Sequence, residues 1–538
     1  MKIEIYDTTL RDGEQGAGIS FSVSDKLEII SCLDSLGADF IEAGTYMKGS
    51  RDISPGAVFD KINYENTRAT ISAFCATRRA GANTCDDETL RALAKSPVKA
   101  ASVVGKSRLY QVEKILRTTA EENLSMIRDT VGYLKSAEKY VLFDAEHFFD
   151  AYSDDPGYAC LTLETAFSAG ADTAVLCDTN GGTLPGVAGM VTQAVRKKFP
   201  SKKIAIHCHN DIGMADAASL EAVLSGACQV QGTVSGIGER CGNANLCILI
   251  PLLQLKLGFV CVPDERLSLL TAKARRIAEL ANLRFNENAP FVGGYAFAHK
   301  AGMHIDGVSK DPRAFEHIEP ERVGNERNIL ISGMSGRTAI LEKTLQLRPD
   351  LHKDSPETES ALKRVQKYAA EGFQYENAEA SLSLIIRESL GMRKSFYTIQ
   401  SYQVTITEAS SANADEKPST RGGLCTATVK IAVNGKSEMT AAEGYGPVNA
   451  LDCALRKALS RFYSEIESIK LSDYRVRVIS SHEATASKVR VVIETTDGLR
   501  VWRTIGVSSD IVDASRQALD DSFEYFLTSG GTDSSANM

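Results

Sequence analysis

Two histidines separated by one residue end a short apolar run near the middle of the chain. Residues 203–211 read KIAIHCHND, so His207 and His209 follow residues typical of a buried strand. On a β-strand, residues i and i+2 point to the same face, and two imidazoles on one face can share a metal ion. Cys208, between them, should point to the opposite, helical side. The pair alone is equally consistent with two polar residues at a strand end.

A carboxylate motif near the N-terminus favours the metal interpretation. Residues 6–15 read YDTTLRDGEQ and come where another short apolar strand ends, so Asp12 can face the same site. Asn243, in the later segment GIGERCGN, offers an amide oxygen, although its place beside a glycine is also consistent with a simple turn. Asp12, His207, His209 and Asn243 would form a nitrogen and oxygen ligand set that suits Mg, Mn, Co or Zn.

The elements that must position these residues repeat in a regular pattern. Eight strand-like runs alternate with helical patterns within residues 1–265: 3–10, 40–44, 69–74, 100–105, 140–148, 173–179, 204–209 and 229–238. Such alternation requires a parallel sheet with right-handed crossovers, and eight units of this length predict a closed (β/α)8 TIM barrel. A doubly wound open sheet is the alternative. The barrel is favoured because polar residues gather where the runs end, and barrel strands end at one mouth.

The remainder of the chain changes character twice. Residues 266–392 are predicted to form helical linker subdomains, and they carry His304 in the segment AHKAGMHIDG. Residues 393–528 contain two successive sets of three strand-like runs followed by a helix. The two helices share a sequence pattern: one has Val-Asn-Ala from Val448 and the other Val-Asp-Ala from Val512, and each has Ala-Leu four residues after that alanine. This predicts an α+β domain of two βββα repeats, which should pack together or dimerise to cover their sheets. The loop 410–423 and the tail 529–538 are predicted to be disordered.

The composition excludes several classes of protein. The chain has 538 residues, 43% hydrophobic and 24% charged, with a net charge of −8 and no basic stripe, which argues against a nucleic-acid surface. Its 12 cysteines form no CxxC motif or small disulfide framework. No signal peptide or long apolar span is evident, so we expect a cytoplasmic protein without membrane partners.

Three motifs resemble one family of enzymes. DTTLRDGEQ, HCHND and GIGERCGN are similar to the metal-dependent acyltransferases that condense acetyl-CoA with an α-keto acid, namely the isopropylmalate, homocitrate and citramalate synthases. The resemblance covers nearly the whole chain. Within the family, GISFSVSDKLEI, YVLFDAEHFFDAY, VLCDTNGGTLP and VGNERNILISGMSGR resemble the citramalate synthase branch. The barrel motifs alone also fit hydroxymethylglutaryl-CoA lyases and other metal aldolases, so the terminal domain matters for this interpretation.

The resemblance implies a reaction and a set of site residues. It implies a divalent metal (Mn, Mg, Zn or Co), acetyl-CoA as co-substrate, pyruvate as acceptor and (R)-citramalate as product, on the route to isoleucine. It also implies a homodimer and an isoleucine effector bound by the C-terminal domain. The implied metal ligands are Asp12, His207, His209 and Asn243. The implied substrate-binding residues are Arg11, Gln15, Asp144 and Thr179.

The implied catalytic residues are Arg11, Glu146 and His304. His304, supported by Glu146, is the candidate base for the acetyl methyl group, and it must reach the barrel from outside, even from a neighbouring subunit. Arg11 would stabilise the enolate or alkoxide oxygen. Each residue also has a simpler interpretation: Arg11 as a partner of Asp12, Glu146 as a hydrogen-bonding barrel residue, and His304 as a helix cap.

Two departures from the family pattern leave the keto acid open. Phe315 stands eleven residues after His304, where the family usually has tyrosine, and residues 45–50 read TYMKGS in place of a tryptophan-proline-glycine-serine turn. Isopropylmalate synthase is therefore the alternative activity, whereas homocitrate synthase is less favoured because a second carboxylate would need an extra basic partner. A non-catalytic, metal-binding regulatory paralogue is the third alternative. Intact Arg11, Asp12 and Glu146, with both histidines, argue against it.

Overall fold

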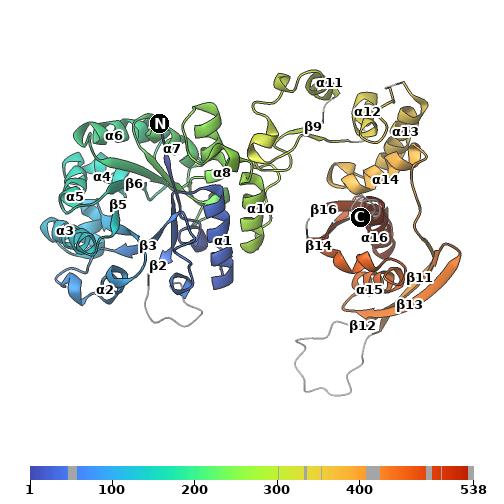
Figure 1. Cartoon of the computed structure of the whole chain (residues 1–538), viewed down its shortest axis with the longest axis horizontal. Coiled ribbons are helices and arrows are strands. Elements are labelled where there is room, and N and C mark those ends of the chain that lie inside the picture. The colour runs from blue at the N-terminus through green and yellow to red at the C-terminus, as the bar shows by residue number, and fades with distance from the viewer. Residues whose placement is uncertain are drawn as a thin grey trace, which may run out of the picture. The chain divides into compact units, whose positions relative to one another are not determined.

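The computed structural model describes residues 1–46, 57–300, 302–331, 336–352, 354–407, 424–479, 487–498 and 500–530. The chain forms two compact units, the first comprising Met1–Phe297 with His317–Arg327, and the second Ala298–Glu316 with Asn328–Met538. Figure 1 shows the first unit as the blue and green part of the chain and the C-terminal domain of the second unit in orange and red.

A closed barrel of parallel strands forms the first unit. The strands are β1 (Glu4–Asp7), β2 (Phe40–Thr45), β3 (Thr70–Ala76), β4 (Ala100–Lys106), β5 (Tyr140–Glu146), β6 (Thr173–Asp178), β7 (Lys203–Cys208) and β8 (Gln229–Gly232). Each strand pairs with its neighbours in sequence order, and β1 also pairs with β8. The (β/α)8 prediction is therefore confirmed, and the open sheet is excluded because no described barrel strand is left at an edge.

Helices follow the strands and cover the outside of the barrel. They are α1 (Val23–Leu36), α2 (Glu88–Lys95), α3 (Ala120–Ser136), α4 (Phe148–Asp154), α5 (Pro156–Ser168), α6 (Pro185–Lys198), α7 (Ala215–Leu224), α8 (Leu246–Pro251), α9 (Asp264–Leu267) and α10 (Leu270–Leu280). Local sequence sets their ends. Helix α1, for example, begins with a capping box between Ser22 and Asp25 and ends at Gly37, which has a left-handed φ of 100°.

Strand alternation separates two cores and turns His207 inward. Ile204, Ile206 and Cys208 of β7 pack in the outer core between strands and helices. Ala205 belongs to the small interior cluster that fills the barrel. His207 therefore points into the barrel, and Cys208 points to the helical layer as the sequence predicted.

The first unit continues beyond residue 265. The barrel domain was expected to end there, because the alternation of strands and helices stops at that point of the sequence. Helix α10 places Leu270, Ala274 and Ile277 on one face, and all three are buried in the outer core of the barrel. Because these residues recur at a helical spacing of four and three, α10 packs against the barrel as one more covering helix.

The second unit begins with the predicted helix-rich region. Its helices are α11 (Gly302–Lys310), α12 (Arg337–Leu345), α13 (Pro356–Glu371) and α14 (Glu379–Ser389), and two short strands, β9 (Ala298–His299) and β10 (Asn328–Ile329), pair in parallel. Helices α12, α13 and α14 share an apolar cluster that includes Ile340, Val365 and Ile386.

The C-terminal domain consists of two βββα units. The first contains β11 (Thr398–Thr407), β12 (Leu424–Val433), β13 (Lys436–Gly444) and α15 (Pro447–Leu459); the second contains β14 (Lys470–Val478), β15 (Val489–Thr496), β16 (Val501–Ser508) and α16 (Ile511–Gly530). Both sheets are antiparallel. The duplication extends to side chains, because Thr440 Oγ1 donates to Ala454 O at 2.8 Å and Thr504 Oγ1 donates to Ala518 O at 2.6 Å. The predicted α+β repeat is therefore confirmed.

The end of the domain lies slightly later than expected. Helix α16 runs to Gly530, so residues 529 and 530 are helical rather than disordered, because Phe523, Phe526 and Leu527 bury the preceding turns in the domain core. Residues 531–538, the loop 410–423 and residues 47–50 of the TYMKGS segment lie outside the described residues. Within the described ranges, no helix has the length and apolar character needed to cross a membrane.

Candidate metal and substrate site

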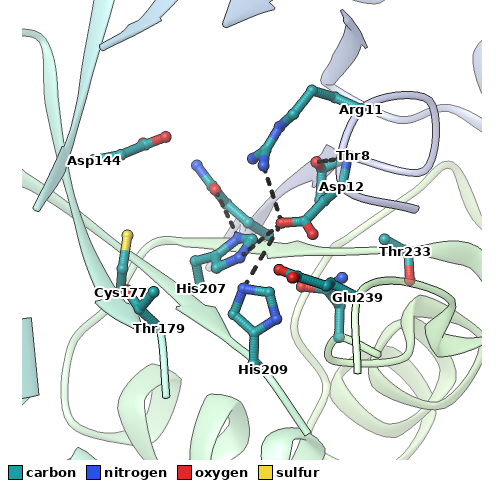
Figure 2. A network of polar contacts seen from close by, with 12 residues as sticks. Thr8, Arg11, Asp12, Asp144, Cys177, Thr179, His207, His209, Thr233 and Glu239 are labelled. Atoms are coloured by element: carbon teal, nitrogen blue, oxygen red, sulfur yellow. Dashed lines mark hydrogen bonds and ion pairs between the residues drawn. The ribbon is translucent and has the colours of Figure 1, made fainter. Parts of the chain in front are cut away.

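Three predicted ligands meet at the carboxyl end of the barrel. Asp12 lies in the turn after β1, His207 near the end of β7, and His209 directly after it. Asp12 Oδ2 lies 3.3 Å from His207 Nε2 and 3.9 Å from His209 Nε2. All three side chains are buried, and one ligand atom from each lies within 4.8 Å of the others. Figure 2 shows both imidazoles directed at the Asp12 carboxylate.

The arrangement fits a divalent cation. Asp12 Oδ1 and Asn243 Oδ1 are buried and find no hydrogen-bond partner in the described part of the chain. Asn243 Nδ2 donates to Ile237 O at 3.1 Å, and the residue forms an isolated β-bridge with His209, so the amide is anchored beside the histidines with its oxygen free. A buried oxygen without a partner costs about 1–3 kcal/mol, which a cation bound by oxygen and nitrogen donors would offset.

The charge states of Asp12 and His209 suit the same role. Although burial alone would raise it, Arg11 and His207 hold the pKa of Asp12 well below its usual range. Burial, reinforced by the neighbouring His207, lowers the pKa of His209 to about 4. At neutral pH Asp12 is therefore a carboxylate and His209 a neutral imidazole, which are the forms that bind metals. Despite burial, the hydrogen bond to Asp12 raises the pKa of His207.

Arg11 is held at the mouth by two carboxylates. Its Nε donates to Glu42 Oε2 at 2.7 Å and its Nη1 donates to Asp12 Oδ2 at 3.1 Å. The guanidinium carbon lies 4.5 Å from the centre of the Phe74 ring. Pairing of Arg11 with Asp12 was the simpler interpretation of the motif, and the contact is present. The contact with Glu42 was not predicted from the sequence.

Asp144 is a buried carboxyl at the end of β5. Ser102 Oγ donates to its Oδ2, whereas its Oδ1 is buried without a hydrogen-bond partner among the residues described. Burial and the nearby Glu42 raise the pKa of Asp144 to about 6. Figure 2 shows the Asp144 carboxyl directed toward Arg11 and His207.

The other predicted barrel residues lie around the same mouth. Glu146 ends β5 and forms a close ion pair with Lys106, its register partner on β4, which the sequence did not single out. Thr179 follows β6, and its Oγ1 accepts a hydrogen bond from His147 N at 2.9 Å. Gln15 is exposed in a short 3-10 turn after Asp12.

His304 belongs to the second unit. It lies on α11 and is exposed, and its ring centre is 4.4 Å from that of Phe315. The residue that replaces the family's usual tyrosine is therefore a direct neighbour of the predicted base. The catalytic roles of His304 and Glu146 remain predictions.

Comparison with known proteins assigns a family to each region. Family models match as HMGL-like over residues 2–267, as homocitrate synthase post-HMGL domain-like over residues 291–372, and as LeuA allosteric (dimerisation) domain over residues 376–527. These three ranges follow the barrel, the helical region and the duplicated domain in that order.

Similar proteins align along nearly their whole lengths. An (R)-citramalate synthase of Aquifex aeolicus is 44% identical over 526 residues, covering 98% of this chain and 98% of the relative. An (R)-citramalate synthase of Synechocystis is 44% identical over 543 residues, covering 99% and 98%. A 2-isopropylmalate synthase of Pyrococcus furiosus is 31% identical over 525 residues, covering 96% and 97%.

Proposed function

The chain belongs to the family of (R)-citramalate synthases, and we propose that it condenses acetyl-CoA with pyruvate and water to give (R)-citramalate and CoA. The observation that carries the proposal is the buried cluster of Asp12, His207 and His209 with Arg11 beside it. Identity to the (R)-citramalate synthases of Aquifex aeolicus and Synechocystis, 44%, exceeds the 31% found for the isopropylmalate synthase of Pyrococcus furiosus, which favours pyruvate over a branched acceptor.

Several barrel residues would bind and orient the keto acid. A divalent ion held by Asp12, His207, His209 and Asn243 would make the keto carbonyl electrophilic when bound. Thr179 Oγ1 accepts from His147 N, so its own proton remains available for the substrate carboxylate. Asp144 and Gln15 would complete the pocket around the acceptor. Arg11 remains protonated and can stabilise the oxygen on which negative charge develops.

The acetyl group needs a base. We assign proton abstraction from the methyl carbon to His304, with Glu146 in support, so that the carbon nucleophile attacks the keto carbon and forms the citramalyl thioester. Water then cleaves the thioester to citramalate and the CoA thiol. Because Glu146 is paired with Lys106, its carboxylate is held at the mouth where the reaction occurs.

The C-terminal domain is proposed to dimerise and to bind isoleucine. The match to the LeuA allosteric (dimerisation) domain supports a regulatory dimer. A cavity of about 800 Å³ lies between α15 of the first repeat and β14 of the second. Its lining combines apolar side chains with both signs of charge, as an amino acid requires: Val448, Ile466, Leu471, Asp452, Glu467, Lys457 and Lys470. A purely structural dimer domain is the alternative.

A CoA-release assay with the purified chain tests the activity. Pyruvate, 2-oxobutyrate, 2-oxoisovalerate and 2-oxoglutarate are compared at saturating acetyl-CoA and Mn²⁺. We expect the highest kcat/KM with pyruvate. An equal or higher value with 2-oxoisovalerate would assign the chain to isopropylmalate synthesis, and no CoA release with any acceptor would favour the regulatory paralogue.

A further inference from the structure

The side chain of Gln231 lies inside the barrel between the strands that deliver two of the ligands. Gln231, on β8, is paired in register with His207 of β7 and with Tyr6 of β1, the strand that leads to Asp12. Its neighbour Val230 packs in the outer core, so Gln231 points inward, and only 1% of it is exposed.

One contact links this side chain to the site. Gln231 Oε1 lies 3.2 Å from His207 Nδ1. An amide oxygen can only accept, so this contact requires the proton of the neutral imidazole on Nδ1. When the ring is neutral, as metal binding requires, the lone pair is then on Nε2, the atom that lies 3.3 Å from Asp12 Oδ2. The opposite orientation of the amide would put the ring proton on Nε2 and remove that atom as a ligand.

The two histidines differ in this respect. His209 Nδ1 is buried and has no hydrogen-bond partner in the ranges that the structure describes. Within those ranges, His207 is therefore the histidine of the pair whose second nitrogen is held by another side chain. A partner of this kind fixes both the tautomer and the orientation of a ligating imidazole.

We propose that Gln231 is a positioning residue that presents His207 Nε2 to the cation, an inference that rests on the proposed metal role of His207. Removal of the contact should leave the barrel intact but let the ring rotate and populate the wrong tautomer. Loss of such a partner typically weakens metal affinity about 10- to 100-fold.

The same strand offers a matched control. Gln229 lies two residues earlier, points to the same interior and is fully buried, but its Nε2 donates to Glu4 Oε2 at 3.1 Å, at the other end of the barrel. A substitution there perturbs packing of the same strand without touching His207.

The experiment measures binding of Mn²⁺ alone to the full chain, by the electron paramagnetic resonance signal of free Mn²⁺. Gln231→Met, which keeps length without an acceptor, should weaken binding about 10- to 100-fold. Gln231→Glu should retain near-normal binding, because a carboxylate also accepts from Nδ1. Gln229→Met should bind like the unmodified chain. Thermal unfolding in chelator checks that each variant folds.

The outcomes separate this inference from the proposed function. If the unmodified chain does not bind Mn²⁺, or if His207→Ala binds it equally well, the metal role of His207 fails and the role of Gln231 fails with it. If that site exists but Gln231→Met binds equally well, only the role of Gln231 is overturned. Equal loss in Gln229→Met, or no rescue by Gln231→Glu, also overturns it. Should Gln231→Met not fold, the shorter Gln231→Asn is compared with Gln231→Glu, and equal affinities contradict the proposal.

Discussion

Glu42 Oε2 accepts a hydrogen bond from Arg11 Nε at 2.7 Å, and the same oxygen accepts one from Thr8 Oγ1 at 2.7 Å. Glu42 is fully buried on β2, so a rigid strand sets the position of the guanidinium that faces the site. The guanidinium of Arg11 contacts the carboxylates of Glu42 and Asp12 at once. The single ammonium of a lysine cannot make both contacts with the same geometry.

Arg11→Lys should therefore lower kcat while the metal site persists. Loss of one well-placed donor to a developing oxyanion costs about 10²- to 10³-fold in kcat. Steady-state CoA release gives kcat, and Mn²⁺ titration shows whether Asp12 still binds. The surface variant Arg313→Lys is the control, because Arg313 is exposed and forms an ion pair with the nearby Asp311. A kcat within a factor of two of the unmodified chain would contradict the role of Arg11.

His207→Ala should abolish metal binding and turnover together. The imidazole is a proposed ligand at the mouth and takes no part in the apolar filling of the barrel, so the fold should survive. Circular dichroism reports the fold, and CoA release after exhaustive chelation and addition of Mn²⁺ reports activity. His352→Ala replaces an exposed histidine and should change neither. Normal turnover of His207→Ala in chelator would refute a metal-dependent reaction at this cluster.

The strand positions and the alternation of their side chains were predictable because each strand is short, apolar and bounded by helical patterns. The inward direction of the His207 side chain and the outward direction of Cys208 follow directly from the two-residue period of a β-strand. The contact of His207 with Gln231 was not predictable, because it depends on which residues face each other across parallel strands. Lys106 was missed for the same reason. The contact of Arg11 with Glu42 was not predictable because it depends on the path of the turn after β1. The sequence predicts a helix-rich segment after residue 265 but not the packing of its helix α10 on the barrel, because only strand alternation was used to place the boundary.

Pyruvate should be preferred over 2-oxoisovalerate. A pocket that fits the methyl group of pyruvate rejects an isopropyl group by overpacking, an effect worth about 1–3 kcal/mol, or roughly 10- to 200-fold in kcat/KM. The ratio of kcat/KM values for the two acids, measured at saturating acetyl-CoA, tests this. 2-Oxobutyrate, one methylene longer than pyruvate, should fall between them. A ratio near one would show that the acceptor pocket does not discriminate by size.

The C-terminal domain should lose stability as pH rises toward neutrality. Burial, with Asp520 nearby, raises the pKa of Asp521 and of Glu524 to about 7 in the folded domain. The unfolded chain releases these protons near pH 4, so between pH 4 and 7 the folded state binds more protons. The stability these carboxyl groups contribute is thus present at low pH and lost as pH rises through about 7.

Trp502 allows this to be measured. It is the single tryptophan of the chain, and its Nε1 donates to Ser522 Oγ of α16 at 3.0 Å. The unfolding midpoint measured by its fluorescence should decrease as the pH is raised from 5 to 8. Glu524→Gln should make this decrease smaller. Glu443→Gln, at an exposed site on β13, is the control. A midpoint that rises with pH, or an unchanged slope in Glu524→Gln, would contradict the assignment.

Isoleucine inhibition should depend on the cavity between the two repeats. Leu471 lines this cavity and is 37% exposed, so Leu471→Trp should fill part of it and weaken inhibition without changing kcat in the absence of isoleucine. Val478 lies on the same strand but outside the lining, so Val478→Trp provides a matched control.

A chain truncated near Lys394 should be insensitive to isoleucine in any active form, because inhibition then has no binding domain through which to act. CoA release during isoleucine titration measures all three. Inhibition that persists unchanged in the truncated chain would exclude the domain as the effector site, and no inhibition of the intact chain by any branched amino acid would leave the domain a structural dimer.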